Sequence, residues 1–465
     1  MKSTLQTTPA TAVILDCGAQ YSQLIARRVR EANVFSELLP YDTPWEEIAR
    51  RSPSAIIITG GPESTLDAGS PSVDRRLYES GVPVLGICYG MQLIARDLGG
   101  KLEKSAQREF GPASLRVDAG AHSLFANVPV TSDIWMSHGD AVVDPPAGFS
   151  RMGHTDRCPV AAFGDEARLI FGVQFHPEVI HTRFGKTIFD NFLHGVAGID
   201  QSWRMESFVD DAIASIRAQV GDAQVICALS GGVDSAVAAT LVARAIGQQL
   251  TCVFVDHGLL RKNEAREVVA AFRDVLHLNV IAVDARERFL SVLAGEVDPE
   301  AKRVLIGHEF IRVFDEEAEK IPGVRFLVQG TLYPDVIESK TPGSKAGHKI
   351  KSHHNVGGLP EQMNLSLVEP LRALFKDEVR EVGRVLGLPN TIVERQPFPG
   401  PGLAVRVLGA VDEERLAIVR EADAIVCEEI ERATLDPKPW QYFAVLTPLK
   451  SCLLYTSDAA DDLTR

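Results

Sequence analysis

Two short segments carry residue types whose spacing could do chemistry. Gly86-Ile87-Cys88-Tyr89-Gly90 places a thiol between glycines, and Ser230-Gly231-Gly232-Val233-Asp234-Ser235 offers hydroxyls and flexible backbone. Each segment follows a short apolar run and precedes a helix-like stretch, so each predicts a sharp strand-to-helix turn with its chemistry at the tip. We therefore expect one chain that couples a cysteine reaction to a reaction of ATP.

The thiol has a candidate base further along the chain. Cys88 is predicted at the start of a helix, where unpaired backbone N–H groups favour a thiolate. His176 and Glu178 lie two residues apart on a segment predicted to be extended, so both side chains face the same side. Glu178 would accept one imidazole N–H while the other nitrogen of His176 faces the thiol. The sequence predicts a catalytic triad of Cys88, His176 and Glu178.

The second segment is predicted to bind phosphate. It lies between the apolar run 225–229 and a helix beginning near Ala236, so its glycines let backbone N–H groups converge on an anion. It lacks the lysine of a Walker A loop, which disfavours a kinase or a GTPase. For Asp234 two interpretations stay open: a contact to magnesium, or a residue that only favours the helix start.

Short apolar runs alternate with amphipathic stretches, the pattern of parallel sheets covered by helices. We predict an α/β fold of two doubly wound, mostly parallel-sheet domains. A polar segment at 198–202 separates them, and a proline and glycine cluster at 397–402 marks a third change. Helices are expected at 22–31 and 204–219, and strands at 12–15, 55–58, 84–87, 169–175, 225–229, 250–255, 279–283 and 326–329.

Composition limits the function classes. The 465 residues suffice for two or three domains, with 45% apolar and 24% charged residues. A net charge of −14 argues against a broad surface for nucleic acid or for an anionic membrane. The seven cysteines are scattered without a Cys-x-x-Cys pair, which disfavours a disulfide framework or a zinc ribbon. Since we find no signal peptide and no membrane-length apolar stretch, we expect a cytoplasmic protein.

Four segments together resemble the class I glutamine amidotransferase family, over about residues 10–198. They are Gly86 to Gln92, Thr59-Gly60-Gly61-Pro62, Ser137-His138-Gly139-Asp140 and Phe175-His176-Pro177-Glu178. The resemblance implies that Cys88 attacks the amide of glutamine, that His176 is general base and acid, and that Glu178 orients it. It also implies an oxyanion hole and glutamine contacts. The oxyanion hole would use backbone N–H groups of Gly60 or Gly61 and of Tyr89, and the glutamine site Gln92, His138, Gly139 and Asp140.

The loop Ser230-Gly231-Gly232-Val233-Asp234-Ser235, with the following Ala236, is similar to the pyrophosphate-binding loop of the ATP pyrophosphatase family. The resemblance implies a domain at about 204–396 that uses ATP and Mg²⁺. Members adenylylate a substrate oxygen, release pyrophosphate held by the loop, and let a nitrogen or sulfur nucleophile displace AMP.

Later segments resemble the GMP synthase family, to about residue 450: residues 251–261, 329–339, 350–360 and 398–403. This resemblance implies glutamine, ATP and XMP as substrates, with ammonia displacing AMP from adenylylated XMP to give GMP. Lys349, Lys351 and Lys376 become candidate phosphate contacts of a lid over ATP. His353 and His354 are adjacent, and adjacent residues make poor joint metal ligands in a helix or a strand. A lid is therefore favoured over a metal site here. Because free ammonia would protonate and escape, we also expect domain closure or a shielded path.

Residues 397–450 are expected to form part of an α+β dimerisation domain, since the resemblance implies a homodimer in full-length members. Residues 451–465 depart from the family and are interpreted as a non-native tail on a truncated chain. Two alternatives stay open. One is another glutamine-fed ATP pyrophosphatase amidotransferase, and the other is a fragment with only glutaminase activity and ATP binding.

Overall fold

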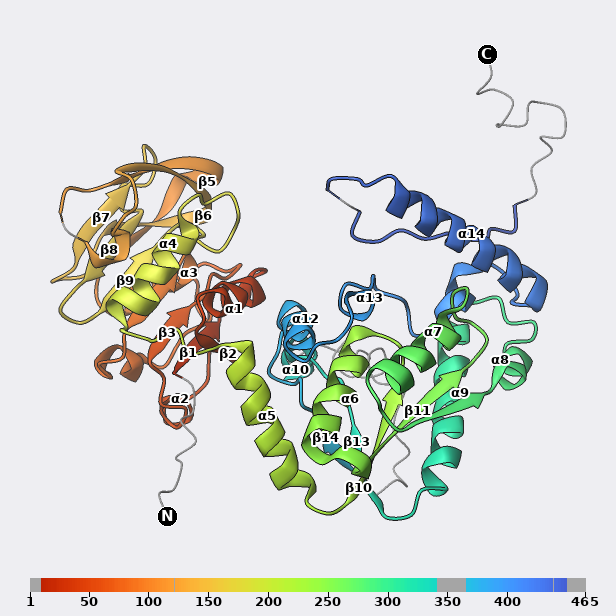
Figure 1. The fold of residues 1–465 in the computed structure, drawn as a ribbon. Helices are drawn as coiled ribbons and strands as arrows, with labels where there is room; N and C mark the ends of the chain where they lie inside the picture. The colour runs from red at the N-terminus through yellow and green to blue at the C-terminus, as the bar shows by residue number, and fades with distance from the viewer. Residues whose placement is uncertain (1–9, 121, 341–364, 438, 450–465) are drawn as a thin grey trace, which may run out of the picture. The chain divides into compact units, whose positions relative to one another are not determined.

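The computed structural model describes residues 10–120, 122–340, 365–437 and 439–449, except the side chains of 105–108 and 338–340. The chain divides into two compact units, Met1–Arg204 and Met205–Arg465. Each is an α/β unit built on one sheet (Figure 1), as the sequence predicts. Among the described residues, no helix has the length and apolar character needed to cross a membrane.

The first unit contains a nine-stranded sheet in the order β2-β1-β3-β4-β9-β8-β7-β5-β6. Strands β2, β1, β3, β4 and β9 run parallel, and the remaining pairs are antiparallel. The strands are β1 (Thr11–Asp16), β2 (Phe35–Pro40), β3 (Ala55–Ile58), β4 (Val84–Ile87), β5 (Lys101–Val117), β6 (Thr131–Asp144), β7 (Ser150–His154), β8 (Ala162–Asp165) and β9 (Ile170–Val173). The helices are α1 (Ser22–Glu31), α2 (Trp45–Ala49), α3 (Tyr89–Asp97) and α4 (Gly185–Asp190).

The core of this unit follows from the alternation of side chains along the strands. Val13 and Leu15 belong to one apolar cluster with Met91 and Ile94 of α3. Ile14 is equally buried, and because successive strand residues face opposite sides, it covers the other face. Helix α1 packs on β1 and β2 and contacts α4. Burial on both faces explains why the parallel strands are continuous apolar runs.

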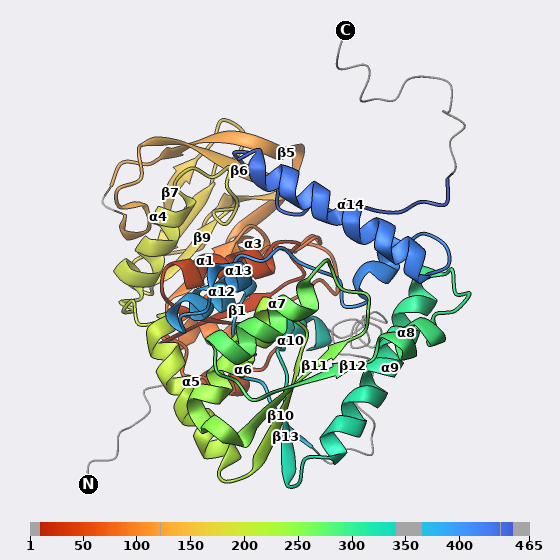
Figure 2. The same ribbon diagram turned by 45° about the vertical axis from the view of Figure 1, so that its right-hand side comes forward.

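The second unit contains five parallel strands in the order β12-β11-β10-β13-β14. Its first strand in sequence, β10, is central, so the connections reverse direction there, as in doubly wound folds. Helices α5, α6 and α12 gather on one side of the sheet and α8 and α9 on the other (Figures 1 and 2). The strands are β10 (Gln224–Leu229), β11 (Leu250–Asp256), β12 (Val280–Asp284), β13 (Val324–Val328) and β14 (Ser366–Val368). The helices are α5 (Met205–Val220), α6 (Val233–Ile246), α7 (Glu264–Ala270), α8 (Arg286–Val292), α9 (Pro299–Glu319), α10 (Tyr333–Lys340), α12 (Lys376–Val385), α13 (Asn390–Val393) and α14 (Glu413–Arg432).

The segment after the proline and glycine cluster packs on the core of the second unit. One apolar cluster joins Leu403 and Leu416 to Ile226 and Val253 of the sheet. Gly402 has φ of +62°, and the backbone N–H of the next residue, Leu403, donates to the carbonyl oxygen of Leu259 at 2.7 Å. This close approach of two backbones explains the glycine. A separate domain at 397–450 stays a prediction.

Candidate active sites

Cys88 lies at the turn between β4 and α3. It precedes the first helical residue, Tyr89, and has φ of 53°, which is uncommon for a residue with a side chain. A Cβ atom on Gly86 would lie 2.5 Å from the backbone of Gly90, and one on Gly90 would clash with the carbonyl oxygen of Ile58. The two glycines therefore permit a strained turn that presents the thiol at a helix N-terminus.

His176 and Glu178 follow strand β9, beside the turn that carries Cys88. Nδ1 of His176 lies 2.7 Å from Oε1 of Glu178, and both residues are buried. Burial lowers the pKa of His176, but hydrogen bonds and charge interactions with Cys88 and Glu178 outweigh it and raise the pKa to about 10. An imidazolium is therefore favoured next to the thiol, which is the arrangement expected of an activated cysteine.

The residues predicted to form the oxyanion hole lie against Cys88 and His176. A Cβ atom on Gly60 would lie 3.4 Å from Cε1 of His176 and 3.7 Å from Cβ of Cys88, so the Gly60 backbone borders both. Gly61 packs on Tyr89, which begins α3 next to Cys88. The structure thus brings all five residues to one place at the ends of β3, β4 and β9.

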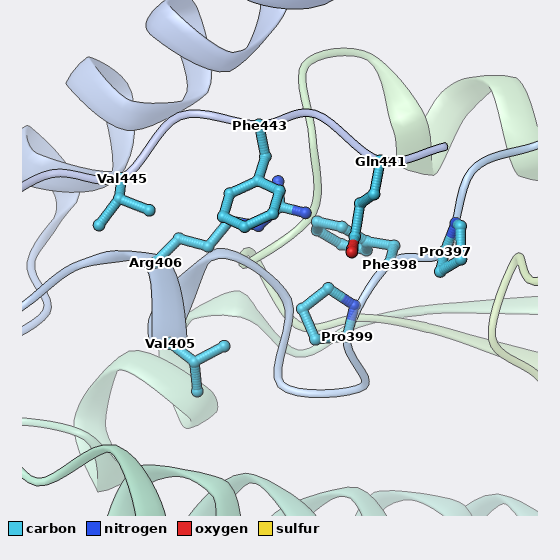
Figure 3. Close-up of a pocket in the computed structure, with 8 residues that line it drawn as sticks. All are labelled: Pro397, Phe398, Pro399, Val405, Arg406, Gln441, Phe443 and Val445. Carbon is cyan, nitrogen blue, oxygen red and sulfur yellow. The ribbon is translucent and has the colours of Figure 1, made fainter. Parts of the chain in front are cut away.

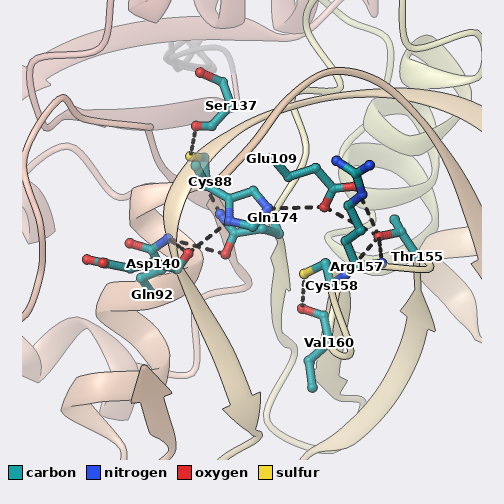
Figure 4. Close-up of polar contacts among 11 residues, drawn as sticks. Cys88, Gln92, Glu109, Ser137, Asp140, Thr155, Arg157, Cys158, Val160 and Gln174 are labelled. Carbon is teal, nitrogen blue, oxygen red and sulfur yellow. Dashed lines mark hydrogen bonds and ion pairs between the residues drawn. The ribbon is translucent and has the colours of Figure 1, made fainter. Parts of the chain in front are cut away.

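Three of the predicted glutamine contacts, Gln92, His138 and Asp140, lie in one hydrogen-bonded network, of which Figure 4 labels Gln92 and Asp140. Gln92 of α3 donates to the carbonyl oxygen of Asp140 at 2.9 Å, and Nδ1 of His138 lies 2.9 Å from the same oxygen. Ser64 donates to the Asp140 carboxylate. Gly139 lies between His138 and Asp140 in β6. The side chains of two predicted residues, Gln92 and His138, therefore meet at the backbone carbonyl of Asp140.

The phosphate loop follows β10 and leads into α6, at the point where the strand order reverses. Gly231 has φ of +75°, and Gly232 precedes the first helical residue, Val233. The Ser230 hydroxyl accepts from the Gly232 N–H at 3.3 Å, and the Ser235 hydroxyl donates to the Gly232 carbonyl at 3.0 Å. The two serine side chains thus hold a turn in which a helix N-terminus faces outward, a site suited to an anion. Ala236, which is also predicted to bind ATP, follows Ser235 in the first turn of α6.

Asp234 and Lys376 meet beside this loop, although they are 142 residues apart in sequence. Nζ of Lys376, the first residue of α12, donates to Oδ1 of Asp234 at 2.6 Å. Within the part of the chain that the structure describes, no group of three or more His, Cys, Asp or Glu residues forms a metal site. Lys349 and Lys351, together with His353 and His354, lie outside the described residues.

Several contacts at these sites involve residues that sequence reasoning missed. Gln174 donates to the sulfur of Cys88, Arg28 donates to the carbonyl oxygen of Glu178, and Thr182 donates to that of His176. In the second unit, Arg395 donates to the carbonyl oxygen of Gly231 and forms an ion pair with the buried Glu264. Only Gln174 had a usable signal, since it lies two residues before His176 in the same motif.

A pocket lies at the proline and glycine cluster of the second unit (Figure 3). Its wall includes Arg406, which is 4% exposed and forms an ion pair with Asp423. The Arg406 guanidinium lies 5.0 Å from the ring centre of Phe398 and 4.4 Å from that of Phe443. Its Nη2 is buried without a hydrogen-bond partner among the described residues. Apart from Arg406 and Gln441, the residues that line the pocket are apolar.

Two family models match this chain, one in each unit. The class-I glutamine amidotransferase family matches residues 13–196, and the NAD synthase family matches residues 204–309. Among solved structures, a glutamine amidotransferase from Thermotoga maritima covers 41% of this chain and 99% of its own, at 17% identity and a TM-score of 0.34.

Curated relatives match nearly the whole chain. The glutamine-hydrolyzing GMP synthase of Caldicellulosiruptor saccharolyticus is 54% identical over 97% of this chain and 88% of its own length. That of Clostridium novyi is 56% identical over 94% of this chain and 85% of its own length. On this identity and coverage, the chain belongs to the glutamine-hydrolyzing GMP synthase family.

Proposed function

We propose that this chain is a glutamine-dependent GMP synthase. It hydrolyses glutamine at Cys88, His176 and Glu178 and uses the ammonia to aminate XMP that ATP has adenylylated. The observation that carries the proposal is the pairing of two sites in one member of this family. One is a strained, buried thiol beside a His–Glu pair, and the other is a phosphate loop at a sheet's reversal point.

At the first site the thiolate of Cys88 attacks the side-chain carbonyl carbon of glutamine. Backbone N–H groups at Gly60 or Gly61 and at Tyr89 stabilise the negative oxygen of the tetrahedral intermediate. His176, whose pKa is raised to about 10, gives its proton to the departing nitrogen, which leaves as ammonia. Water, deprotonated by His176, then attacks the thioester and releases glutamate.

At the second site the loop Ser230–Ser235 binds the β- and γ-phosphates that leave as pyrophosphate. Of the candidate lid lysines, Lys376 lies within the described residues, and it contacts Asp234 at the loop. When ATP binds, Lys376 exchanges this carboxylate for a phosphate oxygen. The C2 oxygen of XMP attacks the α-phosphate, and ammonia then displaces AMP to give GMP.

Magnesium fits this site as an ion that arrives with the nucleotide. Asp234 is a single carboxylate beside the loop, and Mg²⁺ in such enzymes is commonly held by one or two carboxylates together with substrate phosphates. The bound ion would spread the charge of the leaving pyrophosphate. Asp234 would be its protein ligand once Lys376 has released it.

We place the nucleotide acceptor at the Arg406 pocket. Arg406, Phe398 and Phe443 line this pocket, and a cation beside aromatic rings suits a planar, anionic purine nucleotide, through ionic contact and stacking. A homodimer and a cytoplasmic location stay predictions. The exposed Ile418 and Ile425, seven residues apart on α14, support an interface on that helix.

An acceptor panel tests this function. The protein is incubated with ATP, Mg²⁺ and ammonium, and pyrophosphate release is followed with XMP, UTP or nicotinic acid adenine dinucleotide as acceptor. We expect release with XMP alone. The last acceptor is included because the NAD synthase family matches residues 204–309. Release with another acceptor only would replace the GMP synthase assignment by another glutamine-fed ligase. A parallel incubation with glutamine measures glutamate formation. Glutamate formed there, without pyrophosphate release for any acceptor, would favour a fragment with glutaminase activity alone.

A further inference from the structure

The sulfur of Cys88 has a polar neighbour that the triad does not use. Gln174 follows β9 and is completely buried, and its Nε2 lies 3.6 Å from Sγ of Cys88 (Figure 4). A buried amide is costly unless it is hydrogen-bonded, so its placement against the reacting atom calls for an account. On the other side, the carbonyl oxygen of Ser137 lies 3.5 Å from the same sulfur.

The orientation of the Gln174 amide is fixed by its neighbours. The carbonyl oxygen of Asp140 can only accept, so Gln92 must present its NH₂ group there, at 2.9 Å. The second N–H of that group points to Oε1 of Gln174 at 3.3 Å. With its oxygen engaged, Gln174 must turn its own NH₂ group to Cys88. A backbone carbonyl thus determines both amide orientations, and the atom facing the sulfur is a donor.

The N–H of Gln174 interacts differently with the thiol and the thiolate of Cys88. A neutral thiol can donate to the Ser137 carbonyl and accept from Gln174 at the same time. A thiolate loses the bond to Ser137 and faces that carbonyl's negative end, whereas the N–H of Gln174 still donates to it. Hydrogen bonds to a charged acceptor are stronger than those to a neutral one. The Gln174 contact therefore favours the charged form.

We propose that Gln174 is a catalytic residue that stabilises the thiolate of Cys88, held in place by Gln92 and the Asp140 carbonyl. Gln174 is separate from the His176–Glu178 pair, which supplies the base. The inference rests on the proposed role of Cys88 as the nucleophile of glutamine hydrolysis.

The test measures the reactivity of Cys88 without any substrate. The full chain is treated with iodoacetamide across a pH series, and alkylation of the Cys88 peptide is followed by mass spectrometry. For Gln174→Met, which keeps the size but removes the donor, we expect an alkylation rate at pH 7 about tenfold lower. The rise of the rate with pH should move up by about one unit. For Gln174→Glu, whose carboxylate repels a thiolate, we expect a larger displacement.

Asn191→Leu is the matched control. It also removes an amide that donates to two carbonyls in the same unit, those of Leu124 and Ala126, but it lies away from Cys88. Its alkylation profile should match that of the parent. An unchanged profile in Gln174→Met, or an equal displacement in Asn191→Leu, would overturn the proposal. Because neither glutamine nor XMP is present, failure of the parent to make GMP would contradict the proposed function without affecting this readout.

Discussion

Nδ1 of His176 lies 2.7 Å from Oε1 of Glu178, and both residues are held from outside the segment that carries them. Arg28 of α1 donates to the Glu178 carbonyl at 2.9 Å, and the hydroxyl of Thr182 donates to the His176 carbonyl at 2.6 Å. With its Nδ1 proton directed to a carboxylate, the ring has Nε2 left for the thiol. The triad's geometry thus depends on residues outside the recognised motif.

Glu178→Gln should slow glutamine hydrolysis by at least a hundredfold, because an amide in place of the carboxylate no longer stabilises the imidazolium. Glutamate release from glutamine measures this. Ammonium-dependent GMP formation should be unaffected, since it bypasses Cys88. The matched control is Glu166→Gln, a glutamate of the same unit that accepts from Ser123 at the surface. Equal glutaminase rates in both variants would contradict the role of Glu178.

The raised pKa of His176 predicts that the stability difference between the parent and Glu178→Gln depends on pH. The pKa of His176 is raised from its ordinary 6.5 to about 10, so the folded state binds this proton more tightly than the unfolded state. The stabilisation is fully present below pH 6.5 and is lost as the pH rises towards 10. In urea unfolding, the stability difference between the parent and Glu178→Gln should narrow over this range. A difference that stays constant over this range would show that His176 is neutral in the folded protein.

Much of the fold could be predicted because buried parallel strands are continuous apolar runs. The expected strands 12–15, 55–58 and 84–87 lie within or coincide with β1, β3 and β4. Strand 169–175 was expected to be longer than β9, because Phe175 is buried and apolar although the ladder ends at Val173. The antiparallel strands β5 to β8 were not predicted, since polar residues interrupt β5 and pairing with β6 compensates.

The site residues also divide into those that the sequence predicts and those that it does not. Motif residues such as Cys88 and Gly232 lie at strand ends, where local sequence determines a turn. Arg395 carried no signal, because its contact to Gly231 joins positions 164 residues apart. Such a contact depends on how distant elements pack, which a local pattern does not encode.

Gly90→Ala should destabilise the first unit by roughly 3 kcal/mol or more, because its Cβ would collide with the Ile58 carbonyl, which cannot move out of the sheet. Urea unfolding measures this loss. Gly195→Ala is the control, since a Cβ there meets no atom within 4 Å. Equal stability of the two variants would show that the turn at Cys88 is not tightly packed.

Arg395→Met should raise the KM for ATP about tenfold or more, because the Gly231 carbonyl loses its donor and the buried Glu264 loses its ionic partner. Pyrophosphate release at saturating XMP and ammonium measures it. Arg303→Met, which removes a surface pair with Glu300, should leave the KM unchanged. A normal KM in Arg395→Met would mean that the loop holds its conformation without this arginine.

Glutamine labelled with ¹⁵N in its side-chain amide tests the central claim most directly. The protein is supplied with this glutamine, ATP, Mg²⁺ and XMP, and the mass of the purine product is measured. We predict GMP that carries one ¹⁵N atom, and no labelled GMP from Cys88→Ala, which should still form unlabelled GMP from added ammonium. Labelled glutamine converted to glutamate and ammonia without any GMP, or labelled GMP from Cys88→Ala, would contradict the account.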